Sequence, residues 1–153
     1  MTRVLLVFVL TWLPVAPGCP GLDLPPDGEI VRSFAPIGRW AGHWGVDVAA
    51  TSGSPVRAVG AGSVRFAGAI VDNVTVTIDH GGGIVTSYSY LVRVTVRRGD
   101  RVETGSIIGI SGVHDENEAF HLSLRAQGRY VDPLTGPHCM LAPARGLYLV
   151  GGE

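Results

Sequence analysis

Strict alternation of apolar and polar residues, interrupted by glycine, is the feature that most constrains the fold of this chain. In residues 74–79, valine and isoleucine alternate with threonine and aspartate. Side chains of a strand point alternately to the two faces of a sheet, so this period of two predicts a strand with one buried face. Gly81–Gly83 follows and predicts a turn into a second strand over residues 84–91. The segment therefore predicts an antiparallel hairpin.

Short segments of the same kind recur between glycine-containing turns along the rest of the chain. They lie at residues 30–34, 56–59, 63–68, 94–96, 107–110 and 120–125. The chain has 22 glycines and only 16% charged residues, which favours turns and strands over long solvated helices. No window shows a sustained period of 3.6 residues. These features predict one antiparallel all-β domain, and 153 residues suffice to bury its core.

The charged residues exclude several classes of function. The formal net charge of −1 indicates neither a nucleic-acid-binding surface nor a basic membrane-binding one. All 12 basic residues are arginine. Residues 99–102 and 105–109 resemble biotinyl and lipoyl carrier domains, which attach their cofactor to a lysine. A chain without lysine cannot perform that function.

The first 18 residues differ in character from the rest. Arg3 precedes an apolar run from Val4 to Leu13, which proline, alanine and glycine follow. This order is typical of a secretory signal, and the run is too short to cross a bilayer of about 30 Å as a helix. We therefore expect residues 1–18 to be a signal peptide, and the mature chain to be exported to the cell wall or beyond, with no transmembrane span.

Two cysteines bear on the fate of an exported chain. Cys19 follows the predicted signal peptide and would be acylated if the protein were a lipoprotein. Alternatively it pairs with Cys139, because an exported chain permits disulfides. Residues 19–33, which are rich in proline and acidic residues, are expected to form an arm, residues 34–135 the domain and residues 136–153 a C-terminal tail.

An imidazole and a carboxylate lie close together in an apolar segment. His43 and Asp47 would point to the same side of an extended strand, and Gly45 between them would leave their gap open. Zinc accepts a histidine nitrogen and an aspartate oxygen at about 2.0–2.2 Å. Two ligands do not make a site, and a histidine such as His121, inside the predicted strand 120–125, is by itself usually structural.

Seven short motifs carry a family resemblance. They are His43-Trp44-Gly45-Val46-Asp47, Gly53 to Ala58, Gly62 to Gly68, Asp79-His80-Gly81, Arg98 to Val102, Gly105 to Gly109 and Asp132-Pro133-Leu134. From about Phe34 to Leu134 the chain thus resembles the lysostaphin/LytM-type zinc metallopeptidases of bacterial cell walls. The resemblance implies an antiparallel two-sheet sandwich or open barrel. It also implies zinc as cofactor, held by His43, Asp47 and His121 with the fourth position open, and peptidoglycan peptides as substrate.

Two departures from the family pattern concern the chemistry. The family ends its site with a His-x-His pair, whose second histidine corresponds to His121 and whose first is Ala119 here. The family's Tyr-x-His-Leu pattern reads Tyr88-Ser89-Tyr90-Leu91, so Tyr90 replaces the other catalytic histidine. A positioned general base contributes about 10²–10⁴-fold to rate. The departures predict weak, altered or absent hydrolysis.

Other side chains are candidates to replace the two catalytic histidines or to contact the substrate. The phenol of Tyr90 could contact an oxyanion or substrate, or be an ordinary half-buried aromatic. His114, in the polar loop before the last strand, could act as a base over the metal, or the loop could be a solvated connection. Trp44 and Tyr88 are candidates to line a substrate groove, with packing as the alternative. His80 is expected to order its hairpin.

Two functions of different classes follow from these features. The first is an exported zinc endopeptidase that acts on peptidoglycan peptides with a non-standard proton relay. The second is a non-catalytic module that binds wall peptides or activates another cell-wall hydrolase. Chelator-sensitive cleavage by the purified domain would distinguish them.

Overall fold

The computed structural model describes residues 21–24, 27–39 and 41–135. The predicted signal peptide, Cys19, Cys139 and the predicted tail 136–153 lie outside these residues. Within the described part of the chain, no helix has the length and apolar character needed to cross a membrane.

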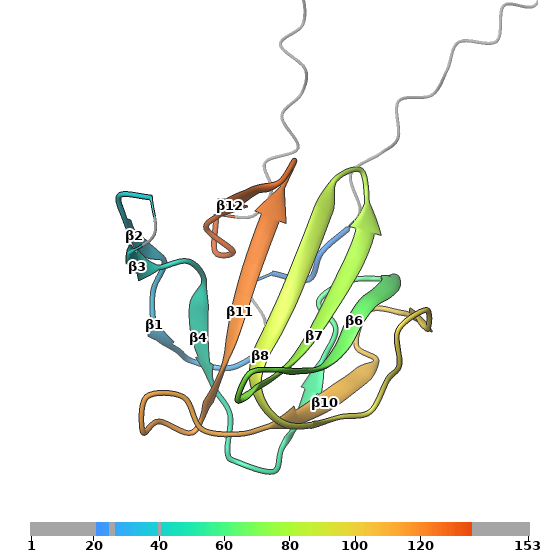
Figure 1. The fold of residues 1–153 in the computed structure, drawn as a ribbon, viewed down its shortest axis with the longest axis horizontal. Coiled ribbons are helices and arrows are strands. Elements are labelled where there is room, and N and C mark those ends of the chain that lie inside the picture. Colours follow the sequence, from blue (N-terminus) through green and yellow to red (C-terminus); the bar gives the residue numbers. More distant parts are fainter. Residues whose placement is uncertain (1–20, 25–26, 40, 136–153) are drawn as a thin grey trace, which may run out of the picture.

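The described residues form twelve strands in two antiparallel sheets, and Figure 1 shows their arrangement. They are β1 (Ile30–Arg32), β2 (Ala35–Ile37), β3 (Ala41–His43), β4 (Val46–Ala49), β5 (Pro55–Arg57), β6 (Gly62–Ile70), β7 (Asn73–Gly81), β8 (Ile84–Val94), β9 (Arg101–Val102), β10 (Ile107–Ser111), β11 (Ala119–Ala126) and β12 (Arg129–Val131). The main sheet runs β1-β4-β11-β8-β7-β6-β9; β10 joins it by pairing with β8, β5 pairs with β10, and β12 pairs with β11. A small sheet contains only β2 and β3. The all-β antiparallel fold predicted from the sequence is confirmed.

The hairpin of β7 and β8 forms the centre of the main sheet. Its strands pair antiparallel, with Thr77 opposite Ser87. Gly81, Gly82 and Gly83 in the turn have φ values of 82°, 58° and 76°. Residues with a Cβ rarely adopt this left-handed region, so consecutive glycines are needed to reverse the chain here. The predicted hairpin is present with the predicted turn.

The two faces of the main sheet differ in chemistry because apolar and polar residues alternate along its strands. The apolar residues of β4, β7 and β11 form the core, and their side chains are fully buried: Val46, Val48, Val76, Ile78, Leu122 and Leu124 are all 0% exposed. The intervening residues, which include Asp47, Thr77 and His121, point to the other face. One face of the sheet therefore builds the core and the other is free to build a site.

The segment predicted as an N-terminal arm contacts the domain in its described part. β1 pairs with β4, with Ile30 opposite Val48. Leu22 and Leu24 pack against the core, and the Asp23 amide donates a hydrogen bond to the carbonyl oxygen of Val59 at 2.6 Å. This segment adds an edge strand beside β4, which carries Asp47.

Tyr88 belongs to the core, so the prediction that it lines the substrate groove is wrong. Its side chain is 0% exposed, and burial raises the pKa of its phenol to about 12. The Val59 amide donates a hydrogen bond to the Tyr88 hydroxyl at 2.8 Å. Tyr88 thereby satisfies a buried backbone group of the loop after β5.

Replacing Tyr88 by phenylalanine is expected to destabilise the domain by about 1–3 kcal/mol, because the buried Val59 amide loses its acceptor. Urea unfolding of the parent and the Tyr88→Phe variant measures the difference. Tyr130→Phe is the matched control: Tyr130 is 43% exposed, so loss of its hydroxyl should leave stability unchanged. Equal stability of the Tyr88→Phe variant and the parent would contradict the assignment.

Candidate metal centre

The register of β4 and β11 brings two of the predicted ligands together. His121 in β11 lies directly opposite Asp47 in β4. Directly opposed residues of an antiparallel pair have Cβ atoms about 4.5–5.5 Å apart on the same face. On the other side of β11, His121 lies opposite Ser89 of β8. A residue 74 positions away from Asp47 in sequence thus reaches it through sheet pairing alone.

His43 reaches the same point from the small sheet. It ends β3, whereas Asp47 lies in β4 of the main sheet, and the chain bends at Trp44 and Gly45 between them. The expectation of one extended strand from His43 to Asp47 is therefore wrong. The two side chains still converge, because the bend redirects the chain between β3 and β4 and brings His43 Nε2 within 3.0 Å of Asp47 Oδ1. The Nδ1–H of His43 donates to the carbonyl oxygen of Ser33 at 2.8 Å, which leaves Nε2 free to face Asp47.

Gly45 is required because the His121 ring occupies the space beside it. A Cβ at position 45 would lie 2.5 Å from His121 Nε2 and 2.7 Å from its Cε1, and would also collide with the carbonyl oxygen of Leu122. From the sequence, Gly45 is expected to leave a gap open between His43 and Asp47. The imidazole of His121, the third predicted ligand, fills that gap.

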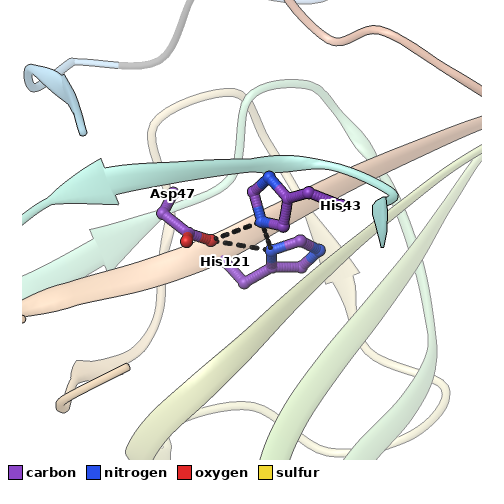
Figure 2. Close-up of side chains that lie close together, drawn as sticks. All are labelled: His43, Asp47 and His121. Atoms are coloured by element: carbon purple, nitrogen blue, oxygen red, sulfur yellow. Dashed lines mark hydrogen bonds and ion pairs between the residues drawn. The ribbon is translucent and has the colours of Figure 1, made fainter. Parts of the chain in front are cut away.

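The three predicted ligands form a compact cluster (Figure 2). Asp47 Oδ1 lies 3.0 Å from His43 Nε2 and 2.8 Å from His121 Nδ1, and the two nitrogens are 3.0 Å apart. Ligand atoms of a tetrahedral zinc with bonds of about 2.0–2.1 Å lie about 3.3 Å apart. The cluster needs an outward adjustment of only a few tenths of an ångström to accept the ion.

The electrostatics of the cluster favour the protonation states that a metal needs. Burial of Asp47 opposes ionisation, but the hydrogen bond from His121 and the positive potential of the surrounding histidines outweigh it and lower the pKa of the carboxyl below its ordinary value. Burial lowers the pKa of His121, against the opposing effect of Asp47. An ionised carboxylate and a neutral imidazole are the forms that bind a metal.

The cluster lies in an open groove of about 700 Å³ on the polar face of the sheet. Hydroxyl groups of the central strands line it in pairs, with Thr75 3.0 Å from Ser89 and Thr77 3.0 Å from Ser87. Trp44 lines the groove, and its ring lies 5.7 Å from the ring of Tyr130 with the two planes tilted by 56°; its contact with substrate stays a prediction. The groove is thus lined by aromatic rings, by the hydroxyl groups of β7 and β8, and by the His/Asp/His cluster.

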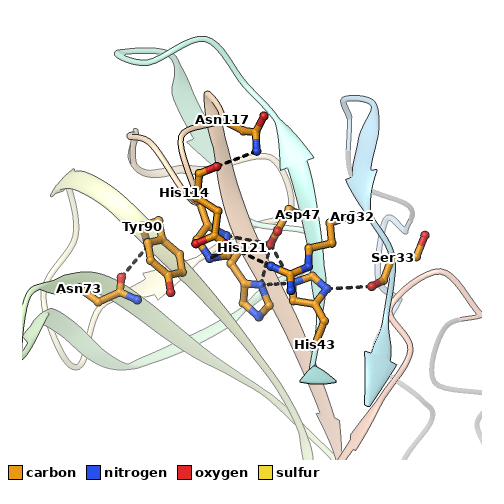
Figure 3. A network of polar contacts seen from close by, with 10 residues as sticks. Arg32, Ser33, His43, Asp47, Asn73, Tyr90, His114, Asn117 and His121 are labelled. Atoms are coloured by element: carbon orange, nitrogen blue, oxygen red, sulfur yellow. Dashed lines mark hydrogen bonds and ion pairs between the residues drawn. The ribbon is translucent and has the colours of Figure 1, made fainter. Parts of the chain in front are cut away.

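Of the two positions where the family has catalytic histidines, neither offers a base. Ala119 is fully buried in β11 opposite Ala49. Tyr90 lines the groove, and its ring stacks on the ring of His114 with centroids 3.5 Å apart and planes 15° from parallel (Figure 3). His114 is brought to the cluster as well, with Nδ1 3.1 Å from Asp47 Oδ1. The sequence made His114 a candidate base but gave no signal for such close contact with Asp47.

His80 lies in a separate hydrogen-bonded position, as expected. Its Nδ1–H donates to the carbonyl oxygen of Ala61, and its Nε2 lies 2.8 Å from Thr86 Oγ1. Burial lowers the pKa of its imidazole. His80 ties the β7–β8 hairpin to the start of β6 and takes no part in the metal cluster.

An antiparallel β domain that holds a His/Asp/His cluster at an open groove has the features of a metallopeptidase. The sequence pattern of Peptidase family M23 matches residues 41–133, which is more than half of the chain. The protein belongs to that family, and the lysostaphin/LytM-type resemblance predicted from the motifs is confirmed.

Individual relatives support the family assignment. Uncharacterized protein Rv2891 of Mycobacterium tuberculosis is 41% identical over 58% of this chain and 36% of its own length. The Lipoprotein NlpD/LppB homolog of Pseudomonas aeruginosa is 32% identical over 77% of this chain and 40% of its own. The solved structure of a zinc-containing peptidase from Vibrio cholerae is 25% identical, with a TM-score of 0.61 over 70% of this chain and 36% of that chain. The chain thus spans well under half of these relatives.

Proposed function

We propose that this protein is an exported zinc-dependent peptidase domain that acts weakly on peptidoglycan peptides. The observation that carries the proposal is the convergence of His43, Asp47 and His121 from two sheets onto one point in an open groove. The family to which the chain belongs supports a peptide substrate. The V. cholerae relative with the same fold is described as zinc-containing, which supports zinc as the metal.

The cluster fits zinc by its chemistry as well as by its spacing. Two imidazoles and one carboxylate are a common donor set for catalytic zinc. Asp47 is only 4% exposed, and a carboxylate kept ionised at such burial needs a positive partner. When bound, zinc would polarise a carbonyl group and lower the pKa of water towards about 7.

The remaining groove residues would bind and orient a peptide. The hydroxyls of β7 and β8 can donate to and accept from peptide groups, and Trp44 offers an apolar face. Tyr90 lies where its phenol can contact the substrate. Because Ala119 has no polar group and Tyr90 has a phenol in place of an imidazole, we expect proton transfer to be slow.

Export is supported by two observations. The first 18 residues have the order of a secretory signal, and one relative is named a lipoprotein. A lipoprotein anchored at Cys19 is the alternative to free secretion, and the disulfide between Cys19 and Cys139 is the alternative to acylation.

A second function is favoured by the loss of both family histidines. A domain that keeps the groove without efficient hydrolysis could bind wall peptides or activate another hydrolase. The groove and its aromatic wall would serve either function.

Cleavage of purified peptidoglycan tests the proposal. We expect the zinc-loaded chain to release new amino groups about 10²–10⁴-fold more slowly than an M23 domain that has both histidines, because the positioned base is absent. A chelator should abolish the release and added zinc should restore it. Binding of wall peptides without any release would favour the regulatory function, and release unaffected by the chelator would exclude the zinc mechanism.

A further inference from the structure

His114 is a buried histidine with one ring nitrogen that lacks a hydrogen bond. Its side chain is only 7% exposed, and among the described residues its Nδ1 is the one buried side-chain polar atom without a hydrogen-bond partner. A buried polar group without a partner is costly, so such a group in a folded protein calls for a physical reason. The surroundings of this nitrogen supply one.

The unpartnered nitrogen faces the carboxylate of the metal cluster (Figure 3). His114 Nδ1 lies 3.1 Å from Asp47 Oδ1, without the alignment of a hydrogen bond. His121 Nδ1 is closer to the same oxygen, at 2.8 Å, and makes the hydrogen bond. His114 itself is not a member of the group whose ligand atoms could share one ion. It therefore stands beside the three ligands, next to the carboxylate of one of them.

The hydrogen bond between His121 and Asp47 is incompatible with a bound metal. An imidazole nitrogen binds a metal through its lone pair, so the same nitrogen cannot carry a hydrogen. His121 Nδ1 would therefore stop donating to Asp47. His43 Nε2 cannot replace it, because the hydrogen of that neutral ring is on Nδ1, which donates to the carbonyl oxygen of Ser33. His114 Nδ1 is then the remaining imidazole nitrogen beside Asp47 Oδ1 that can donate.

The second nitrogen of His114 has no comparable acceptor. Its Nε2 lies 3.7 Å from Asp115 Oδ2, beyond hydrogen-bond distance, and Arg32 pairs with that carboxylate at 2.7 Å. The closer carboxylate is that of Asp47, on the Nδ1 side. The hydrogen of a neutral imidazole resides on the nitrogen with the better acceptor, so the surroundings favour Nδ1–H.

A tight loop holds the backbone of His114. The amides of His114 and Asn117 each donate to the carbonyl oxygen of the other, at 2.8 and 2.9 Å. Between them, Asp115 and Glu116 have φ values of 47° and 66°. Non-glycine residues adopt this left-handed region only where the surroundings enforce it. The loop thus fixes the point from which the His114 side chain extends.

Tyr90 holds the ring of His114. The two rings stack with centroids 3.5 Å apart (Figure 3), and Tyr90 has a left-handed φ of 63°. The Asn73 side chain accepts a hydrogen bond from the Tyr90 amide at 2.7 Å, and the Gly112 amide donates to the Tyr90 carbonyl oxygen at 3.0 Å. His114 is thus held at its backbone and at its face, in one orientation toward Asp47.

We propose that His114 is a positioning residue of the metal centre, and that its Nδ1–H donates to the Asp47 carboxylate when the cluster holds zinc. The inference rests on the proposed zinc site of His43, Asp47 and His121, and it leaves the fourth coordination position open. Hydrogen bonds from outside the ligand set orient metal-bound side chains and contribute about 10–100-fold to metal affinity. Tyr90, which replaces a family histidine, serves the site by holding His114.

The test measures zinc affinity of the full chain in competition with a chromophoric chelator. His114→Phe keeps an aromatic ring against Tyr90 but has no donor, so its zinc affinity should fall by about 10–100-fold. His114→Asn places an amide nitrogen where Nδ1 lies and should recover most of the affinity. His114→Gln places its amide where Nε2 lies and should behave like His114→Phe. His80→Gln alters an imidazole outside the cluster and should bind zinc like the parent.

Cobalt spectroscopy distinguishes positioning from direct ligation. The visible absorption of the cobalt-substituted parent and of His114→Phe should agree in shape and intensity, because His114 is not bonded to the metal. Different spectra, parent-like zinc affinity of His114→Phe, or an equal loss in His114→Asn and His114→Phe would each overturn this inference alone. A folded parent that binds no zinc would overturn the proposed function together with it.

Discussion

A His121→Ala variant should purify without zinc, whereas the parent should contain about one zinc ion per chain. His121 supplies the only ligand from β11, and its Nδ1 makes the shortest contact of the cluster, 2.8 Å to Asp47 Oδ1. Without His121, only His43 and Asp47 of the three ligands remain, so zinc affinity should fall by more than about 100-fold. Atomic emission of dialysed protein measures the content.

Thermal unfolding measures the loss of zinc binding in His121→Ala independently. A ligand that binds only the folded state at about 100 times its Kd stabilises that state by about 2.7 kcal/mol. Added zinc should therefore raise the Tm of the parent and leave that of His121→Ala unchanged. His80→Gln should respond like the parent, because His80 lies outside the cluster. Equal zinc in the parent and in His121→Ala would show that the ligand assignment is wrong.

Gly45→Ala should impair both the fold and the metal site. The new Cβ would lie 2.5 Å from His121 Nε2 and would meet the carbonyl oxygen of Leu122. The carbonyl group of Leu122 cannot move without disturbing the pairing of β11 with β4. The imidazole of His121 would therefore have to shift away from its position in the cluster. Overpacking of this kind typically costs about 1–3 kcal/mol, and more where backbone is involved.

The matched control for this change is Gly21→Ala. A Cβ at position 21 meets nothing within 4 Å, so this variant should match the parent in Tm and in zinc affinity. Gly45→Ala should show a lower Tm and a zinc affinity reduced by more than about 10-fold, which urea unfolding and chelator competition measure. Parent-like values for Gly45→Ala would contradict the placement of the His121 ring.

The sequence allowed prediction of the strands and of the ligand set. Alternation in residues 74–79 placed β7 correctly, because a period of two is a local property of the chain. The family motifs identified His43, Asp47 and His121, which the structure brings together. The bend between His43 and Asp47 was missed, because the same residues are compatible with one extended strand until the pairing of β3 with β2 is known.

The misplacement of Tyr88 has a specific physical cause. In a regular strand Tyr88 and Tyr90 would share one face, and Ser87 and Ser89, which line the groove, would share the other. Tyr90 has a left-handed φ of 63°, and the pairing of β7 with β8 shifts register between Val74 and Val76 opposite it. The irregularity turns the ring of Tyr90 towards the groove while Tyr88 stays in the core. Nothing in the local sequence reveals such a bulge.

The bend between β3 and β4 would give a bound metal a structural role as well. His43 belongs to the β2–β3 sheet, whereas Asp47 and His121 belong to the ten-stranded sheet. An ion bound by all three residues would link the two sheets, as a disulfide links two distant segments. Part of the free energy of metal binding would then stabilise the folded state. Removal of the ion by a chelator would break this link between the β2–β3 sheet, which Trp44 follows directly, and the main sheet.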